Sequence, residues 1–338
     1  MCESLDLAPA PIGRERQAFE TERASWGGNA VRDTDTGVWS LFAAEMQQGG
    51  LHAFKGANGS QLIRAEALSP AGPFVRKEVL HAPLAHNPQP YAFANGSVCV
   101  FMIATPFDGN NTRNTTGGFP YKLTVGCAPR PAGPFEWVQP LLLDLNGSAI
   151  DKDNPSAVFN ERDGSVTLVT RGISLFRASD WRGPYFMQVE DVLPIADTSE
   201  DPFLFRTTRG WHMLLHDHQP FAFHKQVTVH AFTKDPSGIS GWRFNDRTPA
   251  ATGTNISFDD GSVHTFCSRQ RPQLLFEEPP DSDGTQRGRP MLFFTGAQHG
   301  PLSEKVCGNT TIKNEFNPFF DYSFTFVQPF TQHEDAVV

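Results

Sequence analysis

Residues 200–216 read EDPFLFRTTRGWHMLLH. The stretch opens on two acids and a proline, continues as an apolar segment, turns at a glycine and returns as a second apolar segment. Proline is tolerated at the first residue of a strand because its missing N–H lies outside the ladder, and a glycine between apolar runs marks a turn. The stretch therefore predicts a β-hairpin whose first strand begins beside acidic side chains.

The same pattern recurs along the chain. Four copies place a polar residue before a proline, at His86-Asn87-Pro88, Asp153-Asn154-Pro155, Glu200-Asp201-Pro202 and Arg269-Gln270-Arg271-Pro272. Their second apolar segments are residues 97–104, 165–171, 211–216 and 290–296. A first copy without the proline is residues 26–31, WGGNAV, followed by residues 38–45. Repetition on a scale of about 40 to 50 residues or more is typical of propeller blades or solenoid units.

A second signal closes the outer part of each unit. It is a Gly-Pro-aromatic group after a third apolar segment, at Gly72-Pro73-Phe74, Gly133-Pro134-Phe135 and Gly183-Pro184-Tyr185, with Gly241-Trp242 as a reduced copy. Hairpin, third strand and short outer strand make a four-stranded antiparallel blade. We predict an all-β protein in which residues 26–330 form one five-bladed β-propeller around a central channel. An N-terminal extension (1–25, with a possible short helix at 13–23) and a tail (331–338) flank it.

Composition fits this architecture and narrows the function. The 29 glycines and 27 prolines are spread along the 338 residues, as many short strands and turns require. The net charge is −9 with no run of Lys or Arg, which argues against a binder of nucleic acid or of an anionic membrane. No stretch approaches the roughly 18 apolar residues of a membrane span. We expect a monomer that takes a neutral substrate.

Sequons and cysteines point to the secretory pathway. Seven N-x-S/T sequons occur, at Asn58, Asn95, Asn110, Asn114, Asn146, Asn255 and Asn309. The five cysteines allow two disulfides, Cys99 with Cys127 and Cys267 with Cys307, leaving Cys2 over. Residues 1–17 lack the apolar core of a signal peptide. We expect a secreted glycoprotein; buried free thiols in a cytosolic protein are the alternative.

The predicted fold gathers polar side chains at the axis, because the first strand of every blade lines the channel. The converging set is Asn29, Glu45, His86, Asn87, Asp151, Asp153, Asn154, Glu200, Asp201, His216, Arg269 and Arg271. Cleavage of a glycosidic bond needs two carboxyl groups flanking it, and Asp153, Glu200 and Asp201 supply them. Adjacent strand residues point to opposite faces, so only one of Glu200 and Asp201 is expected to face the axis squarely. Asp-Pro and Asn-Pro also begin strands simply as turn formers.

These blade openings and Gly-Pro-aromatic groups resemble the arabinanase, levansucrase and invertase superfamily of five-bladed propellers, and glycoside hydrolase family 43 in particular. The resemblance spans residues 26–297. It implies an inverting hydrolase with an Asp base from the first blade, an Asp that tunes pKa and a Glu acid. It also implies no required cofactor, although a calcium or sodium ion is possible in the channel. The first-blade position reads Gly28-Asn29-Ala30, with no carboxylate.

The resemblance assigns roles to particular residues. Glu200 is the expected general acid with Asp201 beside it, and Asp153 or Glu45 is its partner. The expected substrate-binding residues are Trp26, Asn29, His86, Asn87, His216, Arg269 and Arg271. Aromatic faces suit the apolar faces of sugar rings, so Trp26 and residues 221–223 are candidate stacking platforms, with packing within the blades as the alternative.

Two further functions stay open. One is a non-catalytic saccharide-binding propeller, which the missing first-blade acid favours; the other is a protein-interaction propeller, which needs no convergent acids. A separate histidine cluster is compatible with metal binding or with ordinary strand and loop positions, and consists of His212, His216, His218, His224 and His230.

Overall fold

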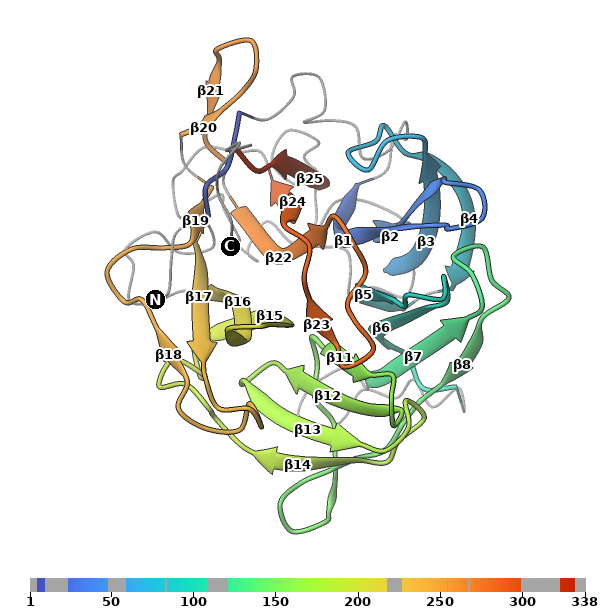
Figure 1. The fold of residues 1–338 in the computed structure, drawn as a ribbon. Helices are drawn as coiled ribbons and strands as arrows, with labels where there is room; N and C mark the ends of the chain where they lie inside the picture. The colour runs from blue at the N-terminus through green and yellow to red at the C-terminus, as the bar shows by residue number, and fades with distance from the viewer. Residues whose placement is uncertain are drawn as a thin grey trace.

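The computed structural model describes residues 5–9, 24–47, 59–82, 84–107, 121–217, 227–253, 255–266, 268–298 and 323–331. They form five antiparallel blades arranged in a ring, so the predicted propeller is confirmed (Figure 1). None of these residues belongs to a helix long and apolar enough to cross a lipid bilayer. The predicted short helix at 13–23 lies outside the described residues.

The first two blades are four-stranded, as the sequence predicts. Blade 1 is β1 (Ser25–Arg32), β2 (Trp39–Met46), β3 (Ser60–Ala67) and β4 (Val75–His81). Blade 2 is β5 (Ala85–Ala92), β6 (Val98–Ala104), β7 (Lys122–Ala128) and β8 (Glu136–Val138). Cys99 and Cys127 stand opposite each other on β6 and β7 and form the predicted disulfide. Cys267 and Cys307 lie outside the described residues.

Blades 3 and 4 carry extra edge strands. Blade 3 is β11 (Ser156–Asn160), β12 (Ser165–Thr170), β13 (Ser174–Ala178) and β14 (Tyr185–Val189), with the hairpin β9 (Leu142–Leu143) and β10 (Ala149–Ile150) outside β14. Blade 4 is β15 (Ser199–Thr207), β16 (Gly210–Asp217), β17 (Val227–Thr233) and β18 (Arg243–Phe244), with β19 (Ala251–Thr252) also on β17. A separate hairpin, β20 (Ile256–Ser257) and β21 (Val263–His264), precedes blade 5.

Blade 5 closes the ring with both ends of the chain. Its strands are β22 (Ser268–Phe276), β24 (Pro290–Gln298) and β25 (Ser323–Pro329). Residues 5–9 lie against it, because Leu7 bridges Phe330 and the amide of Ala8 donates to Pro329 O at 2.9 Å. Part of the predicted N-terminal extension therefore belongs to the last blade. Closure of this kind leaves fewer open sheet edges.

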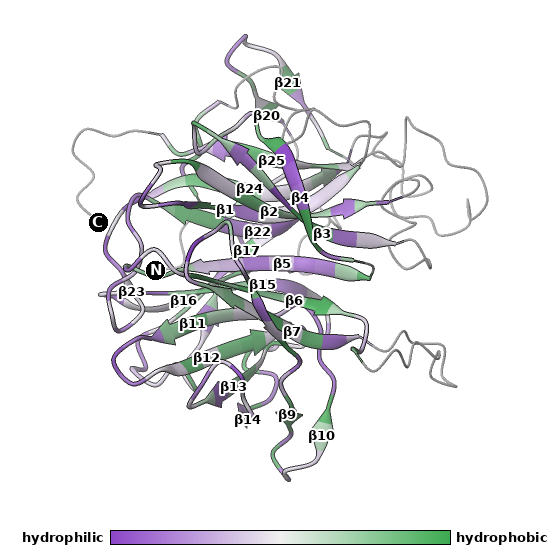
Figure 2. Ribbon diagram, turned by 90° about the vertical axis from the view of Figure 1, so that its right-hand side faces the viewer, coloured by the Kyte–Doolittle hydropathy of each residue, from purple (hydrophilic) through white to green (hydrophobic). Residues whose placement is uncertain are grey.

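Phenylalanine dominates the packing between blades. Most of the largest fully buried side chains are Phe, among them Phe42, Phe101, Phe176 and Phe293. Flat rings suit the filling of the space between two twisted sheets. Some strands are apolar along most of their length, such as β6, whose seven residues are all buried, and Figure 2 shows this strand mostly in green.

The chain between β22 and β24 crosses one end of the central channel. It contains β23 (Thr285–Gln286), which pairs in parallel with β15 through Arg206 and Thr285. Figure 1 shows this segment in front of the centre of the ring. The innermost strands begin at the other end, which we call the mouth.

Candidate functional site

A β-bulge lies at the start of the innermost strands. The register with the second strand slips between Trp26 and Asn29 in blade 1, and between Glu200 and Phe203 in blade 4, with equivalent slips in blades 2 and 5. Blade 3 has no such slip, but a residue at this point has a positive φ in every blade: Gly27 (63°), Asn87 (57°), Asn154 (51°), Asp201 (58°) and Arg271 (60°), with Asn154 two residues before β11. A non-glycine residue held at such φ costs about 1–3 kcal/mol, and residues of this kind concentrate at functional sites.

These five residues, which we call the inner ring, meet across the axis. Asn87 Nδ2 donates to Asn154 Oδ1, and Asn154 Nδ2 donates to Asp201 Oδ1 at 2.7 Å. Arg271 Nη1 donates to the same Asp201 oxygen at 2.5 Å. Each of these hydrogen bonds joins two blades, so the bulges turn polar side chains toward one another. The cavity left between them is about 20 Å³, close to the space of one water molecule.

Blade 1 contributes no side chain to the inner ring. A Cβ placed on Gly27 would lie 2.9 Å from Cδ and 3.1 Å from Cβ of Arg271. The arginine side chain thus occupies the space that a first-blade side chain would need. Nearby Asn29 is 4% exposed and donates from Nδ2 to Leu274 O at 2.9 Å, which ties blade 1 to blade 5.

Two carboxylates lie beside the inner ring at the mouth. Asp153 and Glu200 each precede an inner-ring residue, and both face Arg171 in the turn after β12. Arg171 Nη1 lies 3.6 Å from Asp153 Oδ2, and its Nε lies 3.6 Å from Glu200 Oε2. The side chain of Asp153 is 35% exposed, that of Glu200 is 21% exposed and that of Arg171 is 54% exposed. We call Asp153 and Glu200 the acid pair; one guanidinium spans them, and both reach solvent.

Glu200 and Asp201 join the same cluster although they are adjacent in sequence. Ligand atoms of Glu200, Asp201 and His216 all lie within 4.8 Å of one another. The expectation that only one of the two acids faces the site therefore needs correction. The positive φ of Asp201 and the bulge break the alternation of side chains at this point.

Burial controls the electrostatics of the inner ring. Desolvation raises the pKa of Asp201 to about 7; Arg271 opposes this shift, and the charges of Glu200 and Asp153 add to it. Burial also raises the pKa of Tyr121, with a further contribution from Asp153, so that its hydroxyl stays protonated. The mouth thus combines two partly exposed acids with a buried acid that is readily protonated.

Acceptor oxygens surround the small axial cavity. Asn87 Oδ1, Asp201 Oδ2 and Gln273 Oε1 are buried and have no hydrogen-bond partner among the described residues, and the same holds for one donor, Arg271 Nε. Carboxylate and amide oxygens are the ligands that Ca²⁺ and other hard cations prefer. The oxygen atoms fit a sodium or calcium ion better than a transition metal, while the Arg271 guanidinium on the same cavity opposes a cation.

Comparison with known proteins gives a likeness in structure only. No family model and no curated protein sequence matches the chain. Zg3597, a family 117 glycoside hydrolase of the marine bacterium Zobellia galactanivorans, superposes with a TM-score of 0.59 at 12% identity, over 97% of this chain and 90% of that one. The catalytic domain of the Coprinopsis cinerea GH62 α-L-arabinofuranosidase gives 0.56 at 12% identity, over 97% and 95%. The GH43_1 enzyme from Xanthomonas citri gives 0.54 at 11% identity, over 98% and 93%.

The chain has the propeller fold of these glycoside hydrolases. The predicted resemblance is thereby confirmed at the level of the fold. At this identity the likeness carries no residue roles, so the assignment of residues depends on the geometry of the mouth itself.

Several residues predicted for the site lie elsewhere in the propeller. Glu45 is 1% exposed and binds Arg76 Nε at 2.9 Å and Gln61 Nε2 at 2.7 Å, all within blade 1. Trp26 is 1% exposed and packs on Gly296, where an added Cβ would lie 2.6 Å from the indole. Neither side chain is placed to touch a ligand at the mouth. Residues 221–223 lie outside the described residues.

Arg269 is structural, unlike Arg271 two positions later. It is fully buried, donates to Thr252 O at 2.8 Å and to Gln328 Oε1 at 3.0 Å, and lies over the rings of Phe293 and Phe326. Burial lowers its pKa to about 9. Asp151 is exposed and pairs with Lys122 at 2.7 Å, and it makes no contact with Arg171 among the described ion pairs.

The histidines divide between two places. His86 is buried in β5, in the position that precedes the inner ring, and His216 lies 3.6 Å from Glu200 Oε1. His212 and His230 instead stack on each other on β16 and β17, with ring nitrogens 3.0 Å apart. His218 and His224 lie outside the described residues.

Sequence reasoning missed Arg171. The backbone amide of Arg171 donates to Asp153 O at 2.8 Å, so Arg171 lies across from Asp153 in blade 3. In blade 4, His216 lies across from Glu200 in the same way. Aligning the second strands of the repeat, as well as the first, would have brought Arg171 and His216 to equivalent positions.

Proposed function

We propose that the protein hydrolyses a glycosidic bond at the mouth of the propeller. The observation that carries the proposal is the acid pair, two solvent-accessible carboxylates from neighbouring blades that contact one guanidinium at 3.6 Å each. Paired carboxyl groups on the two sides of a bond are what acid–base glycoside cleavage requires. The substrate class is an oligo- or polysaccharide.

Each residue of the mouth has a role in this proposal. Glu200 gives a proton to the leaving oxygen, and Asp153 activates water or attacks the sugar carbon. Arg171 and His216 orient the acid pair. The inner ring closes the bottom of the site below the sugar, and its buried Asp201 lies beside Glu200.

The second candidate is a saccharide-binding propeller without catalysis. Gly27 and the overlying Arg271 favour it, because the inner-ring position of blade 1 has neither a carboxylate nor the space for one. In that case the acid pair and Arg171 bind sugar hydroxyl groups and cleave nothing.

A screen with matched variants separates these two functions. Aryl glycosides and natural polysaccharides are incubated with the wild-type chain, with Glu200→Gln, with Asp153→Asn and with the control Asp151→Asn, whose ion pair is exposed. Hydrolysis lost in the first two variants and kept in the control supports the enzyme. Binding of a saccharide without turnover, weakened in the same two variants, supports the alternative. Turnover unchanged by both substitutions refutes the assignment.

We also propose that no organic cofactor is required and that the axial cavity takes a sodium or calcium ion. The acceptor oxygens around it support this. Addition of calcium after treatment with a chelator is then expected to raise the melting temperature, and Gln273→Leu to abolish that increase.

We further propose a secretory-pathway location. Asn95, Asn146 and Asn255 are exposed, as glycan acceptors have to be, and the disulfide fits an oxidising compartment. Asn58, Asn110, Asn114 and Asn309 lie outside the described residues. Expression through a eukaryotic secretory route, followed by enzymatic deglycosylation, should increase the electrophoretic mobility.

A further inference from the structure

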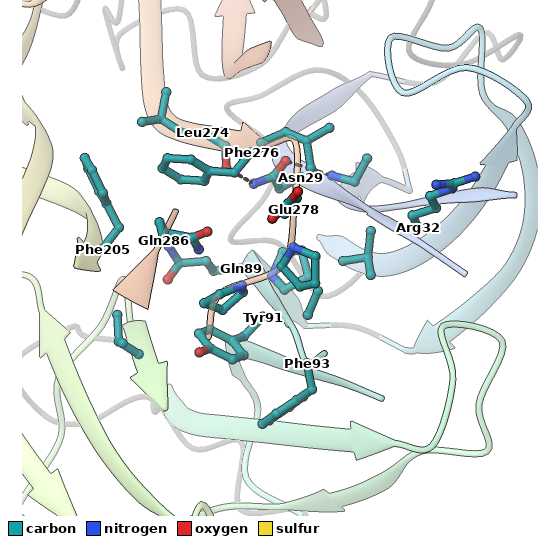
Figure 3. Close-up of a pocket in the computed structure, with 18 of the residues that line it drawn as sticks. Asn29, Arg32, Gln89, Tyr91, Phe93, Phe205, Leu274, Phe276, Glu278 and Gln286 are labelled. Carbon is teal, nitrogen blue, oxygen red and sulfur yellow. Dashed lines mark hydrogen bonds between the residues drawn. The ribbon is translucent and has the colours of Figure 1, made fainter. Parts of the chain in front are cut away.

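A second cavity lies in the channel on the side away from the mouth. Its volume is about 200 Å³, and its walls come from the innermost strands β1, β5, β11, β15 and β22 beyond the inner ring. The chain between β22 and β24, from Glu277 to Gln286, covers it. We call it the rear cavity, and Figure 3 looks into it.

Rings and aliphatic groups form most of the wall. Tyr91 and Phe93 come from blade 2, Phe205 from blade 4, and Leu274 and Phe276 from blade 5. Figure 3 shows these side chains around a common space. A cavity of about 150 Å³ with apolar walls is known to accept benzene, so this one has room for a single ring with a substituent.

Two amide groups give this apolar space a polar end. Gln89 is 6% exposed, Gln286 is partly buried, and the Oε1 atoms of both are buried without a hydrogen-bond partner among the described residues. Both residues line the rear cavity. Because a buried acceptor left unpaired is costly, these oxygens favour a guest that donates hydrogen bonds.

Charged side chains at the opening of the rear cavity also restrict which guests can bind. Glu277 and Glu278 are exposed at the opening, and Arg32 is the single basic residue among those that line the cavity. With acceptors inside and two carboxylates outside, an anionic guest is disfavoured.

We propose that the rear cavity is a second binding site, for a single-ring molecule of the phenol type that carries an O–H or N–H donor and no negative charge. Gln89 lines both this cavity and the small axial one. The rear cavity therefore lies directly behind the inner ring, on the side away from the mouth. The site does not depend on the proposed glycosidase activity.

Ligand-observed NMR on the full chain tests the proposal with phenol, toluene and benzoate as probes. Phenol is expected to bind in the millimolar range, about tenfold more tightly than toluene, and benzoate is expected not to bind. Gln89→Leu should remove the preference for phenol over toluene. The matched control is Gln188→Leu, on the outer strand β14, which should leave both affinities unchanged.

Two further variants keep the proposal refutable if Gln89→Leu does not fold. Gln286→Leu removes the second acceptor and should also weaken phenol binding, whereas Ala157→Leu narrows the cavity and should reduce binding of both phenol and toluene. Near-UV circular dichroism establishes that each variant is folded. Absence of phenol binding to the wild type, equal binding of phenol and toluene, or unchanged binding in Ala157→Leu would overturn the proposal.

Discussion

Replacement of Gly27 by alanine should destabilise the propeller by more than backbone strain alone. A non-glycine residue in left-handed conformation costs about 1–2 kcal/mol, and Gly27 has a φ of 63°. The added Cβ would also stand 2.9 Å from Arg271 Cδ, and overpacking of this kind costs about 1–3 kcal/mol. We expect a total loss of about 2–5 kcal/mol in the free energy of unfolding.

Gly147→Ala supplies the matched control for this experiment. Gly147 has a φ of 81°, yet no atom lies within 4 Å of a Cβ built on it, so its substitution reports strain without a clash. Urea unfolding followed by tryptophan fluorescence gives both free energies. In an Arg271→Ala background the contact at 2.9 Å with Cδ is gone while the one at 3.1 Å with Cβ stays, so the cost of Gly27→Ala should fall toward that of Gly147→Ala. Equal costs of the two alanine substitutions in the wild-type background would show that Arg271 does not fill the first-blade position.

Three other predictions concern stability. Burial and His230 lower the pKa of His212 from 6.5 to about 3. Between these two pH values the unfolded chain therefore binds more protons than the folded chain. The free energy of unfolding falls as the pH drops below 6.5, by about 3 kcal/mol at pH 4. His212→Gln should flatten this slope in urea titrations across that range. Reduction of the Cys99–Cys127 disulfide, which closes a separation of 28 residues, should cost about 3–4 kcal/mol and lower the melting temperature. Arg269→Ala should cost about 3 kcal/mol by calorimetry, while any saccharide affinity of the folded protein stays unchanged.

The propeller could be predicted because local signals and the repeat agree. Proline after a polar residue, as in Asp201-Pro202, marks the start of an innermost strand, and the same sequence signal proves to be a bulge with positive φ. A glycine turn and a second apolar strand follow at similar distances in each unit. Agreement of this kind between levels is what allows a sequence to specify one fold.

The placement of individual side chains was harder to predict. Arg269 and Arg271 belong to one motif, but the bulge between Gln270 and Gln273 sends the first into the blade and the second to the axis. Glu45 is an acidic residue near the end of a second strand, and only the structure shows that Gln61 and Arg76 bind its carboxylate within blade 1. Side-chain alternation can be counted along a regular strand, whereas a bulge resets the count.

The decisive measurement is the rate of saccharide hydrolysis by Glu200→Gln relative to the wild-type chain, on whichever glycoside the wild type cleaves. If the acid pair performs the chemistry, the variant keeps its fold and loses at least about a hundredfold in rate, while Asp151→Asn retains full activity. A folded Glu200→Gln protein that turns over as fast as the wild type would show that cleavage occurs elsewhere.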